Sequence, residues 1–183
     1  MLLVLLAVEA LTTLSLHDYL SVHIFLGLLL IPPVALKLAS TGWRFVSYYR
    51  GSGPYVLRGP PRIGLRLLAP PLVLATVVLF GTGVAFLAVG HGGGLLLTAH
   101  AASFAAWGVL VGIHALAYLG YLRRYGLADW RRARIAPPGS RSRRFAVVAA
   151  LLAGAVVGVA TYSTQTAWLS HRHHHHRFDF RGD

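Results

Sequence analysis

The chain has 183 residues, of which 56% are hydrophobic and 12% charged, and its formal net charge at pH 7 is +12. A soluble domain is usually about a quarter charged, so this composition predicts a polytopic membrane protein. The basic residues lie between or beyond the hydrophobic segments, where they set membrane topology, and this distribution argues against a nucleic-acid partner. The absence of cysteine excludes disulfides, iron–sulfur clusters held by this chain and thiolate haem ligands.

Hydrophobic segments predict an all-α fold, a bundle of five transmembrane helices within residues 1–170, followed by a His-rich tail at 171–183. The expected helices cover residues 1–14, 16–39, 67–89, 95–122 and 145–168. The first is short, because fourteen helical residues span ~21 Å against ~30 Å of hydrocarbon. It lacks a basic residue before its apolar run and contains Glu9, so it does not resemble a cleaved signal peptide. We expect a membrane helix whose natural start lies upstream of Met1.

Local signals refine these helices. Ser15 and Asp18 have the spacing of a capping box at the start of the second helix. Pro32-Pro33 predicts a kink within it. Pro70-Pro71 is expected near the first turn of the third helix, where proline is best tolerated.

The last helix carries small residues at every fourth position, which predicts close helix packing. They are Ala150, Gly154 and Gly158. Two arginine-rich loops, 40–66 and 123–144, separate the hydrophobic segments. We expect a multi-pass protein of the plasma membrane. The positive-inside rule places both loops on the cytoplasmic side and the C-terminal tail outside.

Histidines are the main candidates for a functional site. The fourth helix contains no Asp, Glu, Lys or Arg, yet His100 and His114 lie fourteen residues apart on one face, ~21 Å along the axis. The second and fourth helices run parallel, and His23 and His100 lie ~12 Å and ~9 Å from the same predicted membrane end. Two imidazoles at one depth on facing helices are what an axial pair on haem iron requires.

Glycines beside these histidines fit the same interpretation. Gly27, one turn after His23, would open space beside it, and Gly81 and Gly83 on the third helix would let a flat ring approach the backbone. The competing interpretation is that the histidines are buried and bonded to backbone or hydroxyl groups, and that the glycines only pack helices.

Two segments resemble a known group of proteins. They are LSVHIFLGLLLIPPVALKLASTGWRF at 20–45 and LLTAHAASFAAWGVLVGIHALAYL at 96–119. Both resemble small bacterial b-type transmembrane cytochromes, related to the cytochrome b subunits of hydrogenases and formate dehydrogenases, over about residues 5–125. The resemblance implies a four-helix cytochrome b-like core plus one helix, binding haem b and passing electrons across or into the membrane.

The chain departs from a two-haem pattern. A stacked pair of haems needs two histidines on each of two helices, but fourteen residues after His23 stands Lys37. One haem held by His23 and His100 is therefore expected. The role of His114 stays open. It could bind a haem propionate, a quinone or a second haem completed by another subunit, or it could be a structural histidine.

Other polar residues suggest weaker hypotheses. His17 and His91 are expected in solvated turns. Glu9 is either a proton or quinone relay or a carboxyl bonded to a neighbouring helix. The cluster His171 and His173–His176 could bind metal ions weakly, with His173, His174, His175 and His176 as the ligands.

The leading hypothesis is a haem b electron-transfer protein, the subunit of an oxidoreductase rather than a complete enzyme. It would pass electrons between a quinol or cytoplasmic donor and an acceptor outside. Its partners would be membrane lipid, a quinone and a redox partner subunit. The alternatives are a haem-free membrane scaffold or assembly protein, and a metal-handling membrane protein that uses the tail.

Overall fold

The computed structural model describes residues 2–56, 63–89, 94–121 and 140–164. The predictions for His91, for residues 123–139 and for the tail at 171–183 fall outside these ranges. Every element in the described part is helical. The elements are α1 (Leu2–Thr12), the 3₁₀ turn η1 (Thr13–Ser15), α2 (Leu16–Tyr49), α3 (Gly53–Val56), α4 (Ile63–Val89), α5 (Leu95–Tyr121) and α7 (Ser140–Ala160).

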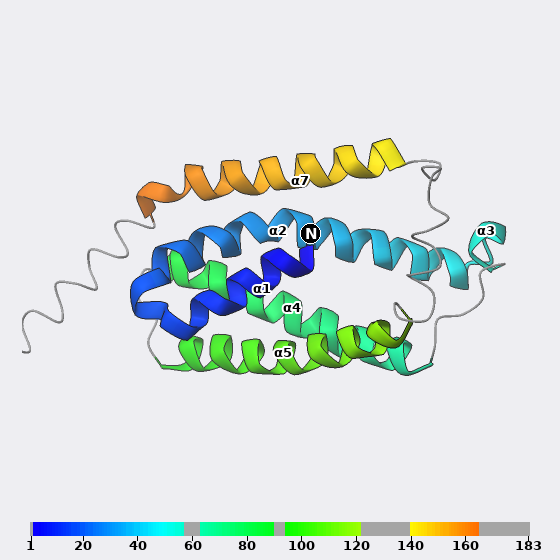
Figure 1. Cartoon of the computed structure of the whole chain (residues 1–183), viewed down its shortest axis with the longest axis horizontal. Helices are drawn as coiled ribbons and strands as arrows, with labels where there is room; N and C mark the ends of the chain where they lie inside the picture. Colours follow the sequence, from blue (N-terminus) through cyan, green and yellow to red (C-terminus); the bar gives the residue numbers. More distant parts are fainter. Residues whose placement is uncertain (1, 57–62, 90–93, 122–139, 165–183) are drawn as a thin grey trace, which may run out of the picture.

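The long helices lie side by side along one axis (Figure 1). α4 packs along α5, and α7 packs along α2. The short α1 folds back from η1 along the first half of α2, so the N-terminal end of α1 lies near the middle of the bundle (Figure 1). One half of the bundle therefore has an additional helix that the other half lacks.

The apolar surface of these helices faces outward. Four spans are long and apolar enough to cross a membrane: Leu2–Tyr49, Ile63–Val89, Leu95–Leu119 and Arg141–Ala160. Between 6% and 22% of the residues in their most apolar windows are buried inside the protein. A helix satisfies its own backbone hydrogen bonds, so apolar side chains on its outer face can be solvated by lipid. The protein is a helical membrane protein.

Five separate spans are not confirmed. α1 has 11 residues, and α1, η1 and α2 together form the first apolar span. A helix of that length covers only ~16 Å, about half of the hydrocarbon thickness. α1 thus forms a helical hairpin with α2 in one half of the bundle.

The second helix is longer than the sequence predicted. It runs to Tyr49, ten residues beyond the predicted end, through a segment that we assigned to a basic loop. It ends before Gly51, whose φ of +76° favours glycine. Residues 40–49 contain no proline and a single glycine, Gly42, which α2 accommodates; the first glycine–proline combination follows at 51–54.

Two local predictions about these helices were wrong in detail. Ser15 is the N-cap residue of α2, as predicted, but its side chain makes no capping hydrogen bond. The backbone of α2 leaves the helical region at Tyr19 (φ −113°, ψ 17°), and the bend at Pro32-Pro33 stays a prediction. Pro70 and Pro71 lie well inside α4, because this helix already begins at Ile63.

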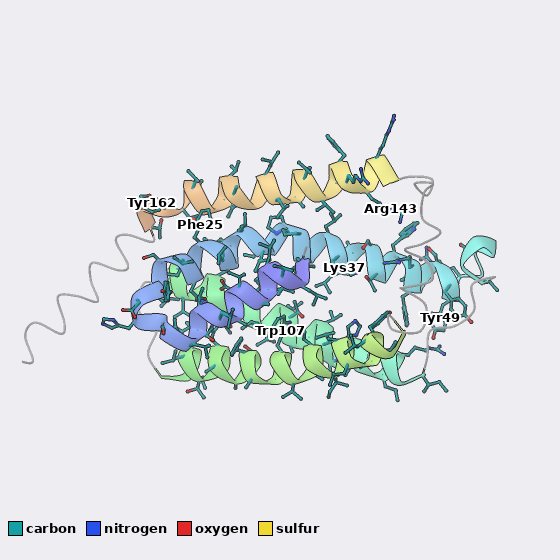
Figure 2. The ribbon with its side chains drawn as sticks, viewed as in Figure 1. Phe25, Lys37, Tyr49, Trp107, Arg143 and Tyr162 are labelled. Atoms are coloured by element: carbon teal, nitrogen blue, oxygen red, sulfur yellow. The ribbon has the colours of Figure 1, made fainter. Side chains whose placement is uncertain are left out.

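The predicted small-residue ridge is the contact surface between α7 and α2. A Cβ added at Gly154 would collide with the carbonyl oxygen of Leu29 and lie 2.9 Å from its carbonyl carbon. A Cβ at Gly158 would lie 2.7 Å from the ring of Phe25, which Figure 2 shows between the two helices. The absence of side chains at these positions lets the two backbones approach, which is how helices associate in lipid.

Basic and aromatic residues collect at one end of the bundle. Tyr49 and Arg143 are labelled at this end in Figure 2, and Tyr162 at the opposite end. The guanidinium of Arg66 lies 5.3 Å from the ring centre of Tyr49, and the rings of Phe45 and Tyr49 are 4.7 Å apart. This composition is typical of a membrane–water interface.

Candidate functional site

Two histidines from different helices meet inside the bundle. The ring centres of His23 on α2 and His100 on α5 are 6.4 Å apart, and their planes are nearly perpendicular, at 84°. The sequence-based prediction that these imidazoles share one depth is confirmed. They lie in the half of the bundle that α1 covers.

His23 is held from α1. Its Nδ1 lies 2.9 Å from Oε1 of Glu9 and 3.0 Å from Oγ1 of Thr12. The Thr12 hydroxyl donates to the backbone oxygen of Glu9 at 2.6 Å. Glu9 and Thr12 are three residues apart, so both side chains lie on the face of α1 that meets α2.

His100 is held from α4. Its Nδ1 lies 2.8 Å from Oγ1 of Thr82, and the Thr82 hydroxyl donates to the backbone oxygens of Val78 and Leu79 at 2.8 and 3.0 Å. One turn along α4, the ring of Phe86 meets His100 edge-on at 5.6 Å. The imidazole is therefore oriented by one hydroxyl and one aromatic ring.

We infer the same tautomer for both histidines. A threonine hydroxyl that gives its hydrogen to the backbone carbonyl leaves its oxygen as an acceptor for the imidazole. In this arrangement Nδ1 carries the ring proton and Nε2 carries a lone pair. A neutral imidazole with Nδ1–H bonded to oxygen and a bare Nε2 is the form in which histidine binds metals.

The separation of the rings fits two ligands on opposite sides of one metal ion. A metal bound at ~2.0 Å by two opposed imidazole nitrogens places the ring centres roughly 6.3 Å apart. Within the described residues, no group of three or more His, Cys, Asp or Glu side chains is arranged to hold a metal ion. Two histidines alone suit a haem, because the macrocycle supplies the other nitrogens.

Two of the glycines near the histidines lie beside side chains of the site. Gly83 lies against His100, where a Cβ would stand 3.4 Å from Cε1 of the ring. Gly27 faces Glu9, where a Cβ would stand 3.5 Å from Oε1. A Cβ at Gly81 would meet no atom of the described residues within 4 Å. Both distances are ordinary van der Waals contacts, so Gly83 and Gly27 lie beside the site, but an alanine would also fit at either position.

The remaining predicted residues lie apart from the His23–His100 pair. His114 contacts the ring of Tyr118 at 5.0 Å, and its buried Nδ1 has no hydrogen-bond partner in the described part of the chain. The side chain of His17 is 97% exposed and pairs with Asp18 at 3.3 Å, as expected for a solvated turn. Lys37 is exposed (Figure 2).

The competing interpretation, in which the histidines are bonded to hydroxyl groups, agrees with these contacts, but sequence reasoning did not name the residues that hold the histidines. Thr12 and Thr82 were not predicted, although a threonine in an apolar helix beside a predicted ligand is a usable signal. The contact of Glu9 with a neighbouring helix was one of the two interpretations considered. Its partner His23 was not foreseen, although Glu9 lies six residues before Ser15 and His23 eight residues after it, so a turn there brings them to similar depths.

Comparisons of this chain with protein-family models, with curated proteins and with solved structures found no match. The resemblance to b-type transmembrane cytochromes therefore stays a prediction.

Proposed function

We propose that this protein is a membrane-embedded haem b electron-transfer protein in which His23 and His100 are the axial ligands of one haem. The observation that carries the proposal is the pair of imidazoles with ring centres 6.4 Å apart, each with its Nδ1 within hydrogen-bond distance of an oxygen on a neighbouring helix. A haem b bound there would exchange single electrons between its two iron oxidation states. The residues of the chain hold and orient the imidazoles and surround them with apolar helices.

Each histidine is presented by a different pair of helices. The α1–α2 hairpin holds His23 through Glu9 and Thr12, and the α4–α5 hairpin holds His100 through Thr82. Because these three partners hold the imidazole rings before a haem arrives, little ordering of side chains is needed when it binds.

The membrane orientation is part of the proposal. We place the basic, aromatic end of the bundle in the cytoplasm, by the positive-inside rule, in the plasma membrane of the cell. The His23–His100 pair then lies in the outer half of the membrane. Electrons would pass from a quinol or a cytoplasmic donor, through this haem, to an acceptor outside or a partner subunit.

Absorption spectroscopy tests the proposal. Protein purified in detergent and reduced with dithionite should show the sharp bands of six-coordinate haem b, and His23→Ala or His100→Ala should abolish them. His17→Ala is the matched control, because His17 is exposed. A protein that folds normally and binds no haem, both as purified and after haem is added, would refute the proposal and support the haem-free scaffold.

A further inference from the structure

Glu9 is an acid placed in an apolar environment. Its side chain is 15% exposed, and Oε2 is buried with no hydrogen-bond partner among the described residues. Its other oxygen, Oε1, lies 2.9 Å from Nδ1 of His23. Gly27 on α2 lies beside the carboxyl group, where an added Cβ would stand 3.5 Å from Oε1.

The two imidazoles of the site have unequal partners. The Nδ1–H of His23 meets both a carboxyl oxygen and a hydroxyl oxygen, whereas that of His100 meets the hydroxyl of Thr82. A carboxylate is the stronger acceptor, and hydrogen bonds to charged groups are roughly twice as strong as neutral ones. His23 therefore has more electron density to donate through Nε2 than His100 has.

The carboxylate also needs a compensating charge. A buried carboxylate without a positive partner is costly, and the cost is greatest in a membrane, where water cannot reach it. With two neutral imidazoles, the iron–porphyrin core of a haem, leaving its propionates aside, would carry one positive charge in the ferric form and none in the ferrous form. A carboxylate hydrogen-bonded to one axial histidine therefore favours the oxidised form.

We propose that Glu9 is the positioning residue of His23: it holds the ring proton on Nδ1 and supplies the negative charge that stabilises oxidised haem in the membrane. This inference rests on the proposed function. It also gives α1 a role, because a helix of about half the membrane thickness is long enough to bring Glu9 and Thr12 to His23.

Redox titration of the haem-loaded protein tests the charge. Glu9→Gln keeps the shape and an oxygen acceptor but removes the charge, so its midpoint potential should rise above that of the wild type. Asp18→Asn is the matched control, because it removes an exposed acid from the same hairpin and should leave the potential unchanged. A Glu9→Gln protein that retains haem with an unchanged or lower potential overturns the inference.

Nitrogen-15 NMR of histidine-labelled, haem-free protein tests the positioning without the cofactor. His23 in the wild type should show a protonated Nδ1 and an unprotonated Nε2, and Glu9→Leu should shift the tautomer population toward Nε2–H. Thr12→Val, which leaves Glu9 in place, should change it less. If the wild type binds no haem, the proposed function fails. Independently of that result, a His23 that carries its proton on Nε2, or whose tautomer does not respond to Glu9→Leu, overturns the positioning role of Glu9. The same NMR result decides the positioning if Glu9→Gln cannot be loaded with haem.

Discussion

Replacing Gly154 by alanine should separate α7 from α2. The added Cβ would collide with the Leu29 carbonyl oxygen and stand 2.9 Å from its carbon and 3.0 Å from its Cα. Because carbon atoms settle at about 3.5–4.0 Å, α7 must retreat by roughly 0.6 Å or more. These neighbours are backbone atoms, so no side-chain rotation can relieve the contact.

The cost of that movement follows from the way the two helices pack. Overpacking of a close interface destabilises a protein by about 1–3 kcal/mol. We expect the upper part of this range, because a retreat at Gly154 also opens the contact of Gly158 with Phe25 one turn away. Lipid offers little compensation, since helix association there depends on close packing rather than on the hydrophobic effect.

Unfolding of detergent-solubilised protein by a denaturing detergent measures this cost. Gly108→Ala is the matched control: the same change on α5, where an added Cβ meets no atom of the described residues within 4 Å, should be neutral or stabilise by up to about 1 kcal/mol. Equal stability of the Gly154→Ala and Gly108→Ala variants would refute the packing of α7 on α2. In the same assay, Phe25→Ala should offset part of the loss caused by Gly158→Ala, because it removes the ring that the new Cβ meets.

Three further predictions concern the site and the orientation. Thr82→Val leaves the Nδ1–H of His100 without the hydroxyl acceptor and should weaken haem binding about 10–100-fold in a haem titration. Thr82→Ser keeps the hydroxyl and should not weaken binding. Equal losses in both variants would contradict the role of the hydroxyl. His114→Ala should leave the reduced haem spectrum unchanged, because His114 lies about four turns from His100 along α5; loss of haem bands would move the site. The chain has no native cysteine, so a single introduced thiol reports on which side of the membrane its residue lies. Arg143→Cys should react with membrane-impermeant reagents only from the cytoplasmic side, and Leu95→Cys only from outside. The reverse pattern would invert the proposed orientation.

Some of the site could be predicted because it depends on distances along helices. His23 and His100 meet because two parallel helices carry them at similar distances from the same membrane end. Gly154 and Gly158 lie against α2 because a small residue at every fourth position forms one stripe on a helix. Both predictions needed only the helical repeat.

Helix ends and partners could not be predicted in this way. α2 passes through residues 40–49 because no strong helix breaker comes before Gly51, although the charge pattern there is typical of a loop. Ser15 stands at the N-cap position of α2, but its side chain makes no capping hydrogen bond. In each case several local signals competed, and the neighbouring structure determined which of them prevailed.

The sequence by itself determined that this protein is a bundle of membrane helices with two histidines at one depth. The bilayer permits few other arrangements of so apolar a chain, since each backbone polar group must be bonded within its own helix. Only the tertiary structure decided how those histidines are held. The tautomers depend on where the hydroxyls of Thr12 and Thr82 send their hydrogens, and the carboxyl group beside His23 depends on the turn η1, which folds α1 back so that Glu9 lies against His23. Those are contacts between helices, and the helical repeat of one segment carries no information about which side chain of another segment will face it.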